Sequence, residues 1–283
     1  MRQILWAAMA LIALTSVPTA MAAVPAAPQP PQAVGRIDVA YELRFWFVPF
    51  GHTEYHAIFD KGVYQATSHF STSGFVSVFW QAQINAGVSG RLAQSTLAPF
   101  IYDSFARRST DKIQQVKLSF HQYGPPTLLA NPPYNTKRYP VSVQEQEKGI
   151  DPMSAIGAIL TGLSTTPQQP CGTVVRVFDG RRRYNIAFTY LRDEEQVPHA
   201  PLQTDVVHIC ALHYRQIAGY KPNLLRGKNR WPSIYARVID IVAPSAPLGR
   251  YVVPVELWAD TDWGRVSAGL TGLSINGKRI VLR

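Results

Sequence analysis

The sequence is poor in cysteine, in acids and in charge of either sign. Two of its 283 residues are cysteine, 18 are Asp or Glu against 28 Lys or Arg, and charged residues make up 16% of the chain. The hydrophobic share of 46% excludes a disordered chain. The low number of acids does not favour a glycosidase, which needs a pair of carboxylates. The sequence also contains no G-x-S-x-G elbow, phosphate-binding glycine loop or H-E-x-x-H motif. We therefore expect a folded protein that is not an enzyme and uses no cofactor.

Long hydrophobic runs are also missing once the first residues are passed. Near the N-terminus a basic residue, an apolar stretch over residues 4–14 and the small-x-small sequence Ala20-Met21-Ala22 follow one another, as in a secretory signal peptide. A membrane anchor is the alternative, but this stretch is too short to span a bilayer comfortably. We expect a periplasmic protein without a transmembrane segment in the mature chain. The expected organisation is a signal peptide over residues 1–22, a Pro- and Ala-rich linker over residues 23–35 and one β-barrel-like domain over residues 36–283.

The expected export determines the oxidation state that we predict for the two cysteines. An oxidising space favours a disulfide between Cys171 and Cys210 over a pair of free thiols. The bridge would close a loop of about forty residues and contribute about 3 to 4 kcal/mol in the chain-entropy model. Redox catalysis is disfavoured, because the two residues do not have C-x-x-C spacing.

The net charge of +10 constrains the partners. A basic exported protein is drawn to anionic surfaces of the cell envelope, such as phospholipid headgroups, lipopolysaccharide or peptidoglycan carboxylates. The expected partner is therefore an anionic envelope lipid, a glycan or an envelope protein. Nucleic acid is not an expected partner outside the cytoplasm.

Alternation of apolar and polar residues is the main structural signal in the chain. From residue 37 to residue 47 one parity is wholly apolar, while Asp38, Glu42 and Arg44 lie on the other, as in a half-buried strand. Many short strands with no helices between them favour an antiparallel sheet or barrel. Further strands are predicted over residues 54–59, 63–71, 76–84, 90–96, 102–107, 113–120, 205–217, 234–242, 251–258, 266–273 and 278–282. Loops are predicted over the proline-containing residues 123–139, at one end of the barrel, and over the basic residues 219–231.

One helix is predicted over residues 151–163. Asp151 can accept hydrogen bonds from the free amides of the first turn, Pro152 fits the first helical position, and Gly162 is suited to end the helix. Nearly all its other side chains are apolar, which suits a helix enclosed by sheet.

A hairpin follows this helix. The dipeptide Asp179-Gly180 between two strand-like segments predicts a two-residue turn. In that register Arg176 lies opposite Arg183, on a face that also carries Arg181, whereas Arg182 lies on the apolar face with Tyr184. Such a cluster is either a solvated basic face or a site for a phosphate or carboxylate, and an inward Arg182 would pair with a buried acid or with the headgroup of a ligand. The candidate ligand-binding residues are Arg176, Arg181, Arg182, Arg183 and Tyr184.

A weak metal candidate lies near the start of the domain. His52, Glu54 and His56 fall on one face of a strand, and histidine with carboxylate is a ligand set that zinc accepts. Nothing in the sequence supplies the remaining ligands, and a polar strand end is the favoured alternative. We therefore expect no metal.

Three segments carry a resemblance. The helix DPMSAIGAIL, the pair Cys171-Gly172 and the hairpin sequence VFDGRRRY resemble the signature of the DUF3108 family, exported proteobacterial proteins of unknown function. The similarity extends over residues 39–222. It implies a fold like that of the half-open β-barrels of periplasmic lipoprotein carriers, which enclose an apolar cavity, and it implies no activity. The expected fold is mainly β, an antiparallel half-open β-barrel or spiral with a buried helix over residues 151–163 and a stabilising disulfide.

Two functions from different classes fit these features. The first is a non-enzymatic periplasmic envelope protein that binds an apolar or anionic ligand, such as a lipid or a lipoprotein-like molecule, in or on the barrel. The alternative is a structural envelope-integrity factor that acts through protein or peptidoglycan contacts and whose barrel is filled by the helix. An unfilled interior favours the first function and a filled one the second.

Overall fold

The structure is a computed structural model that describes residues 34–74, 77, 81–93, 96–108, 112–163, 165–166, 169–195, 206–225 and 232–281. The expected signal peptide over residues 1–22 lies outside the described residues, as does nearly all of the expected linker. Of the predicted basic loop, Lys221 is described, whereas Arg226, Lys228 and Arg230 are not. Within the described residues, no helix combines the length and apolar character needed to cross a bilayer.

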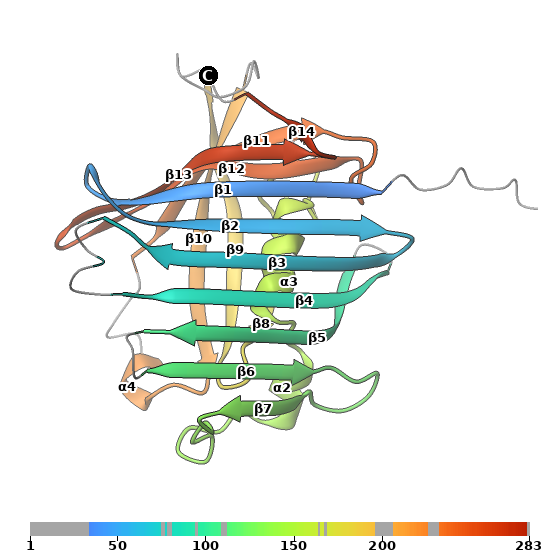
Figure 1. Cartoon of the computed structure of the whole chain (residues 1–283), viewed down its shortest axis with the longest axis vertical. Coiled ribbons are helices and arrows are strands. Elements are labelled where there is room, and N and C mark those ends of the chain that lie inside the picture. The colour runs from blue at the N-terminus through green and yellow to red at the C-terminus, as the bar shows by residue number, and fades with distance from the viewer. Residues whose placement is uncertain are drawn as a thin grey trace, which may run out of the picture. The chain divides into compact units, whose positions relative to one another are not determined.

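The described strands form one antiparallel sheet, shown in Figure 1. Its order is β7-β6-β5-β4-β3-β2-β1-β13-β12-β11-β10-β9-β8, with β14 paired to β13. The order begins at β7 and ends at β8, so the sheet curls without closing, and the predicted half-open antiparallel β fold is confirmed. The strands are β1 (Gly35–Phe45), β2 (Val48–Asp60), β3 (Val63–Thr72), β4 (Gln83–Ala93), β5 (Thr96–Arg107), β6 (Ile113–Ser119), β7 (Thr127–Asn131), β8 (Val174–Phe178), β9 (Arg183–Glu195), β10 (Val206–Ala218), β11 (Ile234–Val242), β12 (Arg250–Thr261), β13 (Gly264–Ile275) and β14 (Lys278–Arg279).

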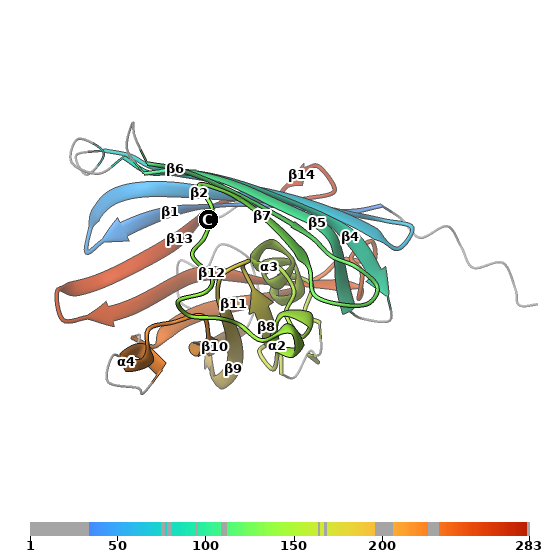
Figure 2. The same cartoon turned by 90° about the horizontal axis from the view of Figure 1, so that it is seen from below.

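The described residues also form three helices, α2 (Val143–Glu147), α3 (Pro152–Leu160) and α4 (Pro222–Leu225). The predicted helix is α3, which Figure 2 shows between the layer of β1–β7 and the strands β8–β11. Asp151 caps it by accepting from the amides of Met153 and Ser154, at 2.8 and 2.9 Å. The predicted start is confirmed, and Gly162, with a φ of +62°, follows the last turn, although the helix ends at Leu160 and not at the predicted residue 163.

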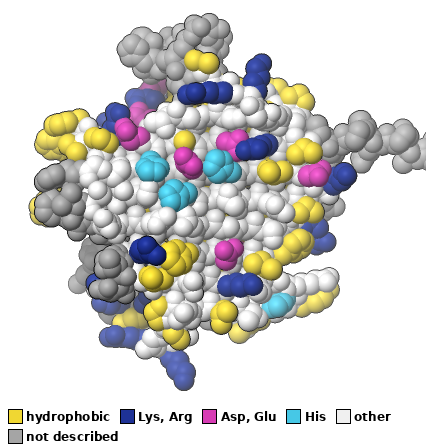
Figure 3. Space-filling view, in the orientation of Figure 1, with side chains coloured by type: hydrophobic (Ala, Val, Ile, Leu, Met, Phe, Trp, Pro, Cys, Tyr) yellow, Lys and Arg dark blue, Asp and Glu magenta, His cyan; other side chains and the backbone are white. Residues whose placement is uncertain are grey.

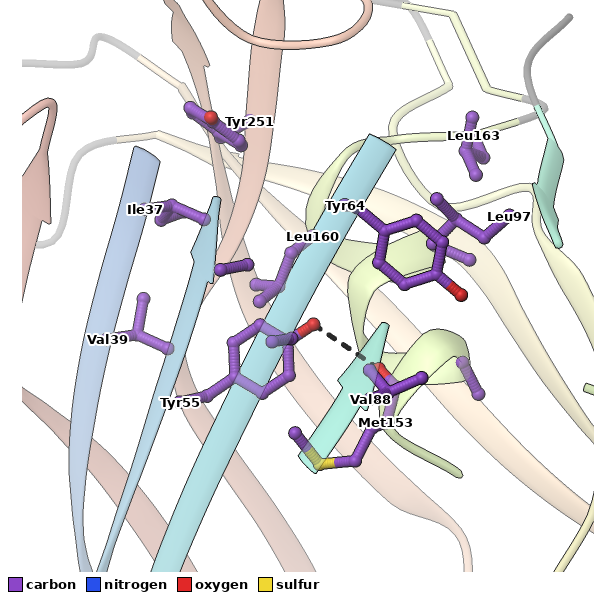
Figure 4. Packing of buried hydrophobic residues seen from close by; sticks show 14 of the residues in the cluster. Ile37, Val39, Tyr55, Tyr64, Val88, Leu97, Met153, Leu160, Leu163 and Tyr251 are labelled. Carbon is purple, nitrogen blue, oxygen red and sulfur yellow. Dashed lines mark hydrogen bonds between the residues drawn. The ribbon is translucent and has the colours of Figure 1, made fainter. Parts of the chain in front are cut away.

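Hydrogen bonds attach the first turn of α3 to the inner face of β2 and β3. The Tyr55 hydroxyl donates to the Met153 carbonyl at 3.3 Å, a bond drawn in Figure 4. The Tyr64 hydroxyl lies 2.6 Å from Ser154 Oγ, which donates to the Asp151 carboxylate. Asp151 has no exposed surface. The carboxylate that caps the helix is therefore also the end of a buried polar chain that reaches the sheet.

The disulfide between Cys171 and Cys210 is confirmed. It joins the segment before β8 to the middle of β10, with 6.1 Å between the two Cα atoms. Both cysteines are buried in a cluster with Phe188 and Val238. The bridge therefore links the chain that leads into β8, the last strand of the sheet, to β10, two strands away.

Several predicted boundaries are wrong. The segment predicted as a strand over residues 76–84 contributes only its last residues to β4, and Ser77 is helical. Residues 90–96 were expected to form a strand of their own, but they contain the end of β4 and the start of β5. The proline-containing loop includes β7, because the prolines at 125–126 and 132–133 flank that strand without interrupting it.

The predicted turn of the β8–β9 hairpin is also wrong. Phe178 pairs with Arg183, so the loop contains four residues, 179–182, where two were expected. Asp179 Oδ1 accepts from the amides of Arg181 and Arg182 at 2.9 and 2.6 Å, which stabilises the longer loop. The expected pairing of Arg176 with Arg183 is therefore replaced by pairing of Arg176 with Asn185.

Replacing Gly180 by valine should destabilise the fold more than the same change at Gly124. Both glycines have a positive φ, +88° and +87°, which costs a β-branched residue about 1–2 kcal/mol. A Cβ at position 180 would also lie 2.7 Å from Leu128 Cδ1, whereas a Cβ at position 124 would meet nothing within 4 Å. Urea unfolding should give a loss for Gly180→Val that exceeds the loss for Gly124→Val by about 1–3 kcal/mol. Equal losses would show that the loop does not pack on β7.

Replacing Asp151 by asparagine should remove a specific pH dependence of stability. Burial raises the pKa of Asp151 from 3.8 to about 6. The folded protein therefore holds this proton more tightly than the unfolded chain. Protonated Asp151 contributes up to about 3 kcal/mol to the free energy of unfolding, fully below about pH 4, and this contribution is lost as the pH rises through about 6. Asparagine keeps the capping oxygen but does not titrate. The wild-type free energy of unfolding, measured relative to Asp151→Asn, should fall between pH 4 and pH 7; a constant difference would contradict this.

Candidate functional site

The inner face of the sheet is fully buried where α3 and the loop around Gly180 cover it. Directly opposite residues of neighbouring strands share a face, so the register identifies a row that crosses six strands. None of its members is more than 7% exposed. The row consists of Ile37, Ala57, Ala66, Val88, Tyr102 and Leu118.

A second row on the same face is not covered in this way. It lies four residues further along β1, towards the β1–β2 turn, and its members are mostly apolar. All of them are only half-buried. The row consists of Tyr41, Thr53, Phe70, Ile84, Ala106 and Gln114. Leu270, opposite Tyr41 on β13, is half-buried too. We refer to these seven residues as the uncovered row, because solvent still reaches inward-facing apolar side chains there.

Three tyrosines, from β9, β10 and the segment just after β10, form a cluster with one arginine of the β8–β9 loop. The rings of Tyr184 and Tyr214 are 4.8 Å apart, and the hydroxyls of Tyr214 and Tyr220 are hydrogen-bonded. Burial raises the pKa of all three phenols, so they stay neutral at physiological pH. The exposed Arg182 guanidinium lies 5.4 Å from the centre of the Tyr220 ring. Arg182 forms no salt bridge with a described carboxylate, but the Asp179 carboxylate accepts from its backbone amide at 2.6 Å and attracts its guanidinium.

Arg183 does not belong to a surface patch. Its side chain is 2% exposed, and it donates to the carbonyls of Glu145 and Tyr184 and to Asn185 Oδ1, at 3.1, 2.6 and 2.8 Å. The Glu145 carboxylate lies 3.5 Å away. Helix α2, which the sequence did not predict, supplies Glu145 and covers this face of the hairpin. The Arg183 guanidinium therefore binds other groups of the protein and is not exposed to a ligand at the surface.

Arg181 lines a surface pocket of about 340 Å³. Lys137 shares its wall, and Thr136 and Gln146 add polar groups. The Arg181 guanidinium also lies 5.6 Å from the centre of the Tyr134 ring. Two cationic side chains beside hydrogen-bonding groups suit a small anion. The exposed Arg176 is not part of this pocket.

The weak metal candidate lies on the outer face of β2, where Figure 3 shows histidines beside acids. His56 Nδ1 is 2.8 Å from Asp38 and its Nε2 is 3.6 Å from Glu54, while His52 Nε2 is 3.0 Å from Ser71 Oγ. The described residues include no group of three or more His, Cys, Asp or Glu able to hold a metal ion. The polar strand face is therefore the better description of His52, Glu54 and His56.

A family model described as a protein of unknown function, DUF3108, matches residues 38–231, which is more than half of the chain. The chain belongs to the DUF3108 family. The match contains the uncovered row up to Gln114, α3, the disulfide and the arginine hairpin, and it includes the whole stretch over which the resemblance was expected. No curated protein matches this DUF3108 chain.

A solved structure is also similar to the DUF3108 chain. It is the crystal structure of a β-barrel-like protein of domain of unknown function DUF1849 from Brucella abortus. The two chains are 9% identical and superpose with a TM-score of 0.46, over 86% of this chain and 98% of the other.

Sequence reasoning missed three contributors to these sites. Tyr214 has the same parity in β10 as the buried Cys210, so alternation alone could have placed it on the inner face. Tyr220 and Lys137 lie in loops, where periodicity gives no direction. Only the folded chain brings Tyr220 to Arg182 and Lys137 to Arg181.

Replacing Arg183 by glutamine should destabilise the DUF3108 protein, whereas Arg176→Gln should not. The first change removes hydrogen bonds from a buried guanidinium and leaves carbonyl oxygens without donors, at about 2–3 kcal/mol. The second removes an exposed side chain and should alter stability by no more than about 0.5 kcal/mol. Thermal or urea unfolding of both variants measures the difference. Equal stability of the two would mean that Arg183 is solvated.

Proposed function

We propose that this DUF3108 protein is a non-enzymatic periplasmic envelope protein that holds the apolar chain of an envelope lipid, or of a lipid-modified molecule, against the uncovered row. The observation that carries the proposal is the contrast between two rows of one sheet face. The row under α3 is buried, whereas the uncovered row retains exposed apolar surface although it faces inward. Covering such surface with an acyl chain gains about 25 cal/mol per Å².

The cluster around Tyr220 supplies contacts for the polar end of that ligand. Tyr184 and Tyr214 have neutral hydroxyls, and Arg182 adds a positive charge that forms no salt bridge with a described acid, although the Asp179 carboxylate lies near it. Arg182 and Tyr184 are the members of the predicted ligand-binding set that best fit this role. An anionic headgroup would make charge-assisted hydrogen bonds to the guanidinium.

Export is part of the proposal and rests on the sequence. The N-terminal residues have the order of a signal peptide, and the bonded cysteines suit an oxidising compartment. A net charge of +10 favours residence near anionic envelope surfaces.

The alternative, a structural envelope factor without a ligand, is supported by the part of the interior that α3 fills. The two functions differ in what the uncovered row does. Ligand binding needs its inward surface to stay accessible, whereas a structural factor does not use it.

Filling the uncovered row should abolish ligand uptake without unfolding the protein. Ala106→Trp places an indole on the half-buried inner face, and Arg107→Trp places the same group on the exposed outer face one residue away. Binding of a fluorescent fatty acid should weaken about tenfold or more in Ala106→Trp and stay unchanged in Arg107→Trp. Native mass spectrometry of the purified mature protein should detect a co-purifying acyl-bearing molecule.

Folding of both variants is checked by circular dichroism. If the wild type takes up no probe and carries no lipid, the binding function is wrong and the structural alternative replaces it. If Ala106→Trp folds and binds as well as Arg107→Trp, the ligand lies elsewhere.

A further inference from the structure

Two hairpins end in exposed aromatic side chains. Phe45, Trp46 and Phe47 lie at the turn between β1 and β2, and Trp263 lies at the turn between β12 and β13. Trp46 is 61% exposed, Phe47 is 79% exposed and Trp263 is 84% exposed. We refer to these four residues as the aromatic tip. Figure 3 shows hydrophobic side chains gathered at the corresponding edge of the front face.

The two turns form one surface. The Trp46 amide donates to the Arg265 carbonyl at 2.7 Å, and the Trp46 indole lies so close over Gly264 that a Cβ there would overlap it. The rings of Phe45 and Trp46 are stacked, with centres 6.4 Å apart. Figures 1 and 2 both show the ends of these hairpins next to each other, at the left of the sheet. The aromatic tip is therefore a contiguous apolar surface contributed by both ends of the sequence.

Charges beside the aromatic tip are largely balanced. Arg44 pairs with Glu42 at 2.6 Å, and Arg265 pairs with Asp260 at 2.8 Å. Asp262 is exposed at the second turn, so the immediate surroundings are not basic. The attraction to an anionic surface would come from the net charge of +10 of the whole chain, and contact itself would depend on the aromatic rings.

We propose that the aromatic tip inserts shallowly into the interface of an anionic phospholipid bilayer. Tryptophan is enriched where membranes meet water, because its ring is apolar and its N–H is polar. The side chains belong to narrow hairpin ends, which can enter between headgroups without carrying the rest of the sheet with them. The paired charges of Arg44, Glu42, Arg265 and Asp260 remain at headgroup level, where paired charges of both signs are already present.

This inference deepens the proposed function and rests on it for its purpose. Along β1 the inner-face positions run from Ile37, under α3, through Tyr41 of the uncovered row to Phe45 of the aromatic tip. A bilayer at the aromatic tip would therefore lie at the end of the sheet nearest the uncovered row. An acyl chain could pass from one apolar environment to the other along the inner face.

The test compares vesicle binding by two variants that lose similar exposed apolar area. Phe47→Ser with Trp263→Ser removes the two most exposed rings of the aromatic tip. Tyr123→Ser with Leu129→Ser removes side chains that are 84% and 69% exposed, in the β6–β7 connection and on β7. Co-sedimentation uses the mature chain and vesicles of phosphatidylcholine with and without phosphatidylglycerol. The first variant should bind the mixed vesicles about tenfold or more weakly, and the second should bind like the wild type.

The depth to which the aromatic tip inserts is measured by quenching of tryptophan fluorescence with lipids that carry bromine on acyl-chain carbons near the headgroup. Quenching should occur in the wild type and fall in Trp46→Phe with Trp263→Phe. Equal vesicle binding by the two serine variants overturns the inference. So does a loss of self-association, measured by sedimentation, in the aromatic-tip variant alone, because that result would assign the surface to a second copy of the chain.

The fatty-acid measurement separates this inference from the proposed function. The aromatic-tip variant should still take up the fluorescent fatty acid from solution, and Ala106→Trp should still bind vesicles. If the wild type binds vesicles but takes up no fatty acid, the proposed ligand binding is wrong and the proposed bilayer contact still holds.

Discussion

The buried carboxylate of Asp151 determines how the interior of this protein is divided. It caps α3 and, through Ser154 and Tyr64, connects that helix to the inner face of the sheet. A capping residue on a surface helix has water as an alternative partner, but Asp151 has no exposed surface. The helix therefore cannot slide along the sheet without leaving a buried polar group unpaired. That constraint fixes which row of the sheet is covered and which is not.

The parts of the fold that the sequence predicted are those encoded by local chemistry. Asp151, Pro152 and Gly162 specify the ends of α3 by hydrogen bonding and φ alone, and alternation identifies most strands. The disulfide was predictable because the chain has only two cysteines and the expected exported compartment favours a bond between them. None of these inferences needed a contact between distant segments.

Some errors are local, such as the hairpin turn, and the others concern groups whose role depends on contacts between distant segments. The Asp179 side chain stabilises the four-residue loop by accepting from two backbone amides. The strand register could therefore not be predicted from the Asp-Gly dipeptide alone. Arg183 was assigned to a surface patch because nothing in the sequence indicated that α2 would cover it. For the same reason the pocket at Arg181 and the cluster at Tyr220 could not be predicted, since each joins a loop to a hairpin far away in sequence.

The unclosed sheet gives the interior a degree of freedom that a closed barrel lacks. In a closed barrel the number of strands and their stagger set the circumference, and widening it breaks ladder hydrogen bonds. Here β7 and β8 end the sheet, and the contacts between their neighbourhoods are those of side chains, such as Leu128, with the loop around Gly180. Ile150 pairs with β8 and can move with it. Widening along this seam would break side-chain contacts but no ladder hydrogen bonds, so every strand would keep its neighbours.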